Sequence, residues 1–157
     1  MPTIAFICTG NVCRSLFAKK TFERMIRENC LENIKILSGG TSSSVKKILV
    51  RGDLKEVFDE YGIDYADHVP RTADKKILKK SDAVLVMTEY QKAELEYRFP
   101  ESCEKIFLLS YFASGVAEDI EDPIGLGKDA YIKAFEIINV HLKNLLRKIS
   151  VKDEILT

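Results

Sequence analysis

Residues 3–15 read TIAFICTGNVCRS. The first six of them, Thr3–Cys8, are mostly apolar and rich in β-forming side chains, which predicts a buried strand. The next five residues predict a loop. A helical pattern then covers about residues 15–29, with Phe17, Phe22 and Ile26 close to helical spacing on one side. A strand that passes through a short loop into a helix favours an α/β fold with a ligand site at that loop.

The rest of the sequence continues this alternation. We expect strands at residues 34–37, 82–87 and 105–109, and helices at residues 53–61, 89–98 and 128–149. We expect the strand at 34–37 to end in a turn at residues 38–40. We expect the helix at 89–98 to end before Pro100. The pattern predicts an open four-stranded parallel sheet with helices on both faces and a phosphate-binding loop after the first strand. No repeat or linker is visible, so we predict one domain over residues 1–157.

Composition narrows the class of protein. The 157 residues include 24 Lys+Arg and 24 Asp+Glu, a formal net charge of zero, which argues against a nucleic-acid binder. No apolar stretch approaches the roughly 20 residues of a membrane span, and the N-terminus does not resemble a signal peptide. We therefore expect a cytoplasmic monomer without nucleic-acid or membrane partners.

The cysteines give no support for a metal site. They stand at positions 8, 13, 30 and 103, no pair is spaced as C-x-x-C, and the two histidines, His68 and His141, are distant in the sequence. We expect Cys30 and Cys103 to be small buried or half-buried hydrophobic residues.

Cys8 differs from these cysteines because a loop and a helix start directly after it. Backbone N–H groups of a tight loop that enters a helix form an anion site, and Gly10 and Asn11 suit the backbone angles of such a loop. Arg14 can bind two phosphate oxygens, and its charge together with the helix dipole favours the thiolate of Cys8. The spacing Cys-x5-Arg-Ser, ending at Ser15, predicts a nucleophile beneath a bound phosphate. The structural alternative is a core cysteine and a surface arginine.

A phosphocysteine reaction also needs an acid to protonate the leaving oxygen. Asp122 precedes Pro123 in the loop that comes after the fourth strand, and the proline favours an extended, stiffened conformation for the aspartate. We expect Asp122 to be this acid. The alternative is an ordinary Asp-Pro turn.

These residues resemble the low-molecular-weight protein tyrosine phosphatases. The resemblance rests on the CTGNVCRS loop, on Asp122-Pro123, and on the segments SGGT at 38–41, GID at 62–64 and VLVMT at 84–88, so it covers nearly the whole chain. It implies that Cys8 is the nucleophile, Arg14 binds phosphate, and Asp122 is general acid and then base. It further implies a phosphorylated protein as substrate, an inorganic phosphate or other oxyanion in the loop, and no cofactor.

The resemblance also implies roles for neighbouring residues. The phosphate-binding residues would be Thr9, Gly10, Asn11, Val12, Cys13, Arg14 and Ser15. Asn11, Ser15, Ser38 and His68 would form the hydrogen-bonded network that holds the loop, and Ser15 would donate to the Cys8 sulfur as it leaves. Without the family, a histidine such as His68 is more often a half-exposed loop residue. Cys13 is placed to trap an oxidised Cys8 as a disulfide, or else only packs beneath the loop.

Three departures from the family bear on the substrate more than on the reaction. Leu16 stands where the family usually has proline, the loop at 41–44 lacks an aromatic residue, and the acid loop reads Asp-Pro-Ile-Gly without the adjacent tyrosines of animal members. Protein-arginine phosphatases share Cys-Thr-Gly-Asn and Asp-Pro-x-Gly, but carry threonine at the position of Val12, so an arginine phosphatase is the alternative function.

Two further functions fit the sequence less well. An arsenate reductase of similar fold would need two more cysteines after the third strand, and residues 88–93 contain none. A non-catalytic phosphate-binding module would have no use for Asp122.

Overall fold

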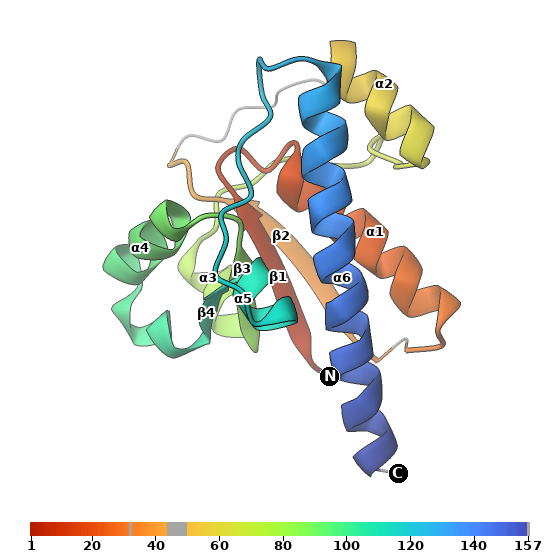
Figure 1. Ribbon diagram of the computed structural model, residues 1–157. Helices are drawn as coiled ribbons and strands as arrows, with labels where there is room; N and C mark the ends of the chain where they lie inside the picture. Colours follow the sequence, from red (N-terminus) through yellow and green to blue (C-terminus); the bar gives the residue numbers. More distant parts are fainter. Residues whose placement is uncertain (32, 44–49, 157) are drawn as a thin grey trace.

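A parallel sheet forms the centre of the molecule. The computed structural model describes residues 1–31, 33–43 and 50–156, with side chains described up to 151. Its strands are β1 (Thr3–Cys8), β2 (Lys35–Gly40), β3 (Ala83–Val86) and β4 (Ile106–Leu108). All neighbouring strands are parallel and lie in the order β2-β1-β3-β4 (Figure 1). The predicted α/β fold with four parallel strands is confirmed.

Helices cover both faces of this sheet. They are α1 (Arg14–Glu28), α2 (Gly52–Tyr61), α3 (Lys75–Lys80), α4 (Glu89–Arg98), the 3-10 helix η1 (Pro100–Lys105), α5 (Leu109–Ser114) and α6 (Lys128–Leu156). Alternate residues of β1 point into two separate cores: Phe6 packs with the side chains of α1, α2 and α6, and Ile7 packs with those of α3 and α4. Both faces of β1 are thus buried, as its continuous apolar sequence requires. None of the described helices is long and apolar enough to cross a membrane.

Stacked aromatic rings hold three helices together beside the carboxyl end of β1. Phe135 of α6 stacks on Phe17 of α1, with ring centroids 4.2 Å apart and planes 5° from parallel. It also stacks on Phe58 of α2 at 5.5 Å and 14°. All three rings are fully buried. The packing therefore fixes α2 and the start of α6 relative to α1, whose first residue is Arg14.

Several local predictions were wrong. β2 continues through Gly40 instead of turning after Leu37, because Gly39 lies against Ala73, where a Cβ would come within 3.3 Å, and Gly40 pairs with Thr72. α4 does end at Arg98, as predicted, but the chain becomes helical again at once, because Pro100 begins η1 and proline fits the first position of a helix. α6 extends past residue 149, to Leu156. Cys30 and Cys103, expected to be buried or half-buried, are exposed.

Candidate active site

The predicted phosphate loop lies at the carboxyl edge of the sheet. β1 ends at Cys8, α1 begins at Arg14, and both side chains are 2% exposed. The left-handed residue of the loop is Asn11, with φ 56°, whereas Gly10 does not take a left-handed φ and a Cβ there would meet open space. Of the two residues expected to suit the backbone angles of this loop, Asn11 is therefore the one in the left-handed conformation, which asparagine tolerates.

The Cys8 sulfur lies within hydrogen-bond distance of the Ser15 hydroxyl group. Its Sγ lies 3.0 Å from Oγ of Ser15, and Nδ2 of Asn11 donates to the same Oγ at 2.9 Å. Because the asparagine amide occupies the hydroxyl as an acceptor, the hydroxyl proton is available to the sulfur. A buried thiolate at Cys8 would accept that proton's hydrogen bond, which stabilises the charged form.

Asn11 is also hydrogen-bonded to the segment that contains His68 and Arg71. The backbone N–H of Arg71 donates to its Oδ1 at 3.1 Å, and Nε2 of His68 lies 2.6 Å from its backbone oxygen. A carbonyl oxygen can only accept, so Nε2 carries the proton. Burial lowers the pKa of His68 below its usual value, with the charges of nearby basic residues adding to the effect and the bond to Asn11 opposing it. The neutral ring with its proton on Nε2 is the form that this environment favours.

Ser38 reaches the network in a way that differs from the expectation. Its backbone oxygen accepts a hydrogen bond from Nε of Arg71 at 3.0 Å. Arg71 therefore connects Ser38 to Asn11, through its side chain on one side and its backbone on the other. It was not among the predicted site residues, because nothing in the sequence near position 71 marks it as a partner of a loop sixty residues earlier.

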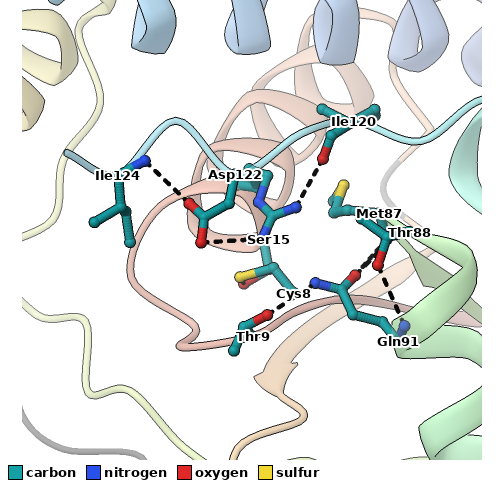
Figure 2. A network of polar contacts seen from close by, with 10 residues as sticks. Cys8, Thr9, Ser15, Met87, Thr88, Gln91, Ile120, Asp122 and Ile124 are labelled. Carbon is teal, nitrogen blue, oxygen red and sulfur yellow. Dashed lines mark hydrogen bonds and ion pairs between the residues drawn. The ribbon is translucent and has the colours of Figure 1, made fainter. Parts of the chain in front are cut away.

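The predicted acid lies beside the predicted phosphate ligand. Nη2 of Arg14 is 3.6 Å from Oδ2 of Asp122, and Nη1 donates to the backbone oxygen of Ile120 at 2.7 Å. Oδ1 of Asp122 accepts from the N–H of Ile124 at 3.1 Å (Figure 2). Ile120 is fixed in turn by its N–H, which donates to the backbone oxygen of Met87 at 2.9 Å. These bonds hold the acid loop against the end of β3.

The Nε–H group of Arg14 is fully buried and has no hydrogen-bond partner among the described residues. An unpartnered buried N–H on a guanidinium is costly, and an oxyanion lying in the loop would satisfy it.

A residue that sequence reasoning missed holds the loop from the other side. Gln91 of α4 is buried, and its Nε2 donates to Oγ1 of Thr9 at 3.1 Å. Its Oε1 accepts from the N–H groups of Met87 and Thr88 at 2.9 and 3.1 Å (Figure 2). Thr88 and Gln91 also form the capping box of α4, and a threonine three residues before a glutamine is the sequence signal that could have revealed the pair.

These groups face a cavity of about 250 Å³. Its lining includes Cys8, Cys13, Arg14 and Asp122. The remainder of its lining is Gly10, Val12, Arg51, Leu54, Ile124 and Tyr131. Burial raises the pKa of the Cys13 thiol well above its usual value, and the proximity of Cys8 adds to this. Within the described part of the chain, no three His, Cys, Asp or Glu side chains gather in a way that could hold a metal ion.

The chain matches a known protein family over nearly its whole length. The family model described as Low molecular weight phosphotyrosine protein phosphatase matches residues 3–155. The chain belongs to this family of phosphatases.

Its relatives fall into two groups by name. Among curated proteins it is 31% identical to a protein-arginine-phosphatase of Geobacillus stearothermophilus, covering 95% of this chain and 97% of the relative. It is 28% identical to the low molecular weight protein-tyrosine-phosphatase PtpB of Staphylococcus haemolyticus, covering 85% and 89%. Among solved structures, the low molecular weight protein tyrosine phosphatase from T. tengcongensis is 31% identical with a TM-score of 0.84, covering 94% of this chain and 99% of that one.

Proposed function

We propose that this phosphatase hydrolyses phosphotyrosine in proteins through a phosphocysteine intermediate. One observation carries the proposal: Cys8, Arg14 and Asp122 line a single cavity, and the buried Nε–H of Arg14 has no hydrogen-bond partner among the described residues. We further propose that the protein acts as a single-domain cytoplasmic monomer and needs no cofactor.

The first half of the reaction transfers the phosphoryl group to sulfur. The Cys8 thiolate attacks phosphorus, the bond from phosphorus to the tyrosine oxygen breaks, and the protonated carboxyl group of Asp122 gives its proton to that oxygen. The guanidinium of Arg14 and the N–H groups of residues 9–15 neutralise charge on the equatorial oxygens, which is the contribution that a metal ion makes in other phosphatases.

The second half returns the enzyme to its starting state. The Asp122 carboxylate takes a proton from water, the resulting hydroxide attacks phosphorus, and the sulfur–phosphorus bond breaks to give inorganic phosphate. The hydroxyl of Ser15 donates to the departing Cys8 sulfur, to which it already lies within hydrogen-bond distance. Asn11, His68, Arg71 and the carbonyl group of Ser38 hold the loop in place through both steps.

The cavity wall favours an aromatic substrate. Val12, Leu54 and Ile124 present apolar side chains to the group attached to phosphorus, and a flat apolar ring buries well against them. Arg51 adds a second cation to the lining. Phosphoarginine carries its guanidino group directly on phosphorus, so a nearby arginine side chain opposes it electrostatically.

Phosphoarginine is the second candidate, because an observation favours it. The 31% identical relative is named a protein-arginine-phosphatase, and this chain has the Asp-Pro-x-Gly acid loop associated with that activity.

The test compares initial rates on matched phosphotyrosine and phosphoarginine peptides in the presence of a chelator. We expect the wild-type protein to prefer phosphotyrosine, and Asp122→Asn to lower kcat on it by about 10²–10⁴-fold. Glu121→Gln removes the same charge from the adjacent position and is the matched control, expected to leave kcat within about twofold. Turnover that survives Asp122→Asn would overturn the mechanism, and a preference for phosphoarginine would transfer the proposal to the second candidate.

A further inference from the structure

A second cavity, of about 270 Å³, lies between the outer edge of the sheet and α3. Its lining comes from the start of β2, from the segment before α3, and from α3 itself; it consists of Lys35, Leu37, Arg71, Thr72, Asp74, Lys76, Ile77 and Lys80. No residue of this lining takes part in the lining of the catalytic cavity. The two cavities are therefore separate places at which a ligand can be held.

Positive charge dominates the second cavity. Four of its side chains, Lys35, Arg71, Lys76 and Lys80, are cationic, and Asp74 is the single acid among the described residues of the lining. The carboxylate of Asp74 is engaged as the cap of α3, where it accepts from the N–H of Ile77 at 2.8 Å. It is thus only a partial counterion to the four cations.

None of these four cations has a carboxylate within 4.0 Å in the described part of the chain. Some lysines elsewhere are paired, Lys55 with Asp59, Lys92 with Glu96, and Lys128 with both Glu56 and Glu60, whereas others on the described surface are not. Lys76 and Lys80 are four residues apart on the same face of α3, a spacing at which like charges repel. Cations gathered around a concave surface create a positive potential that attracts an anion from solution.

One of the cations is held in place to receive such an anion. Nε of Arg71 is bonded to the backbone oxygen of Ser38, which fixes the plane of the guanidinium, and no hydrogen bond engages its two terminal nitrogens within the described part of the chain. A guanidinium held in this way binds two oxygens of a phosphate with less loss of conformational freedom than a flexible side chain. The flanking lysines supply further donors without geometric demand.

The lining also limits what the ligand can be. Its described lining contains no aromatic side chain on which a nucleobase could stack. Leu37 and Ile77 are its apolar residues, and the others are polar or charged. The fitting ligand is compact and carries several negative charges. We propose that this cavity is a second anion site, which binds a small polyvalent phosphate of the pyrophosphate type through Lys35, Arg71, Lys76 and Lys80.

The site borders the support of the catalytic loop. Arg71, which would bind the anion through its side chain, is the residue whose backbone N–H holds the side chain of Asn11. An anion at the second site therefore lies next to the hydrogen bonds that fix the phosphate loop.

Calorimetric titration with inorganic pyrophosphate at low ionic strength tests the proposal. The wild-type protein is expected to bind two pyrophosphate ions, and Arg14→Ala, which disables the catalytic cavity, to bind one. Adding Lys76→Ala and Lys80→Ala to Arg14→Ala should weaken the remaining site about tenfold or more, because two charge-assisted contacts are lost. In the wild-type background the same pair of substitutions should weaken one of the two sites by the same factor and leave the other unchanged.

The matched control is Lys75→Ala with Lys79→Ala. These lysines belong to the same helix, and replacing them removes the same amount of charge, but they do not line the cavity. We expect them to change the affinity of the second site by no more than about twofold. A single pyrophosphate bound to the wild-type protein, the absence of saturable binding to Arg14→Ala, or equal weakening by the two lysine pairs would each overturn the proposal.

Discussion

Replacing Gln91 by leucine would remove one oxygen that serves two backbone N–H groups. Oε1 of Gln91 accepts from Met87 and Thr88, and leucine fills a similar volume without offering an acceptor. Each buried N–H left without a partner costs about 1–3 kcal/mol. Met87 is fully buried whereas Thr88 is half-buried and more accessible to water. We therefore expect Gln91→Leu to lower the free energy of unfolding by about 2–4 kcal/mol.

Urea unfolding followed by circular dichroism measures this loss. With a slope of about 2 kcal/mol per molar urea, the midpoint should fall by about 1–2 M. Gln91→Glu is the matched control: its carboxylate can still accept from both N–H groups, and the first turn of a helix favours negative charge. It should remain within about 1 kcal/mol of the wild-type protein. An unchanged midpoint for Gln91→Leu, or equal losses for both variants, would refute the role assigned to Oε1.

Activity measurements test the second contact of Gln91, which is its hydrogen bond to Thr9. Neither leucine nor glutamate can donate to Oγ1 of Thr9, as Nε2 of Gln91 does. Losing one hydrogen bond of about 1 kcal/mol in the support of the loop should lower kcat/KM by up to about fivefold in both variants. The stability loss is thus expected in one variant and the activity loss in both.

Three further predictions concern the cavity itself. Cys8→Ser should reduce kcat on an aryl phosphate by about 10³-fold or more, because a serine hydroxyl stays protonated. Chelators should leave the rate of the wild-type protein unchanged. Substantial residual activity of the variant, or a need for added Mg²⁺, would contradict the mechanism. Peroxide should inactivate the wild-type protein in a way that thiol reductants reverse, whereas Cys13→Ser should lose that recovery; equal recovery would leave Cys13 with a packing role only. Val12→Thr should raise the phosphoarginine to phosphotyrosine ratio of kcat/KM by about tenfold, since a hydroxyl can hydrogen-bond a polar leaving group; an unchanged ratio would remove Val12 as a determinant of the substrate.

The segment from β1 to α1 was predictable because its signals are local. An apolar run, a short loop and an amphipathic pattern succeed one another without a gap, and the motif from Cys8 to Ser15 lies within them. The short helices α3, η1 and α5 were not predicted. Each has six residues, no more than two turns, so no apolar periodicity can develop over its length.

The supporting residues of the site were predictable only in part, for a reason of distance along the chain. Asn11 and Ser15 are four residues apart in the same motif, so their bond is local in the sequence. Arg71 and Gln91 contact the loop from segments 60 and 82 residues away, through bonds that depend on how the strands are ordered in the sheet. Arg71 contributes a backbone N–H, a group that every residue except proline possesses, so its identity carries no signal for that contact.

The burial of the catalytic groups matches the different tasks that the proposed reaction gives them. Cys8 and Arg14 are 2% exposed and lie on the ends of β1 and α1, so the groups that stabilise phosphate charge are fixed before a substrate arrives and are shielded from water. The side chain of Asp122 is 45% exposed and lies on a loop. It has to give a proton to the leaving oxygen and then take one from water, and a carboxyl group open to solvent can do both within one cycle. A change that buried Asp122 as deeply as Arg14 would therefore be expected to slow the second step, in which water must reach it, more than the first.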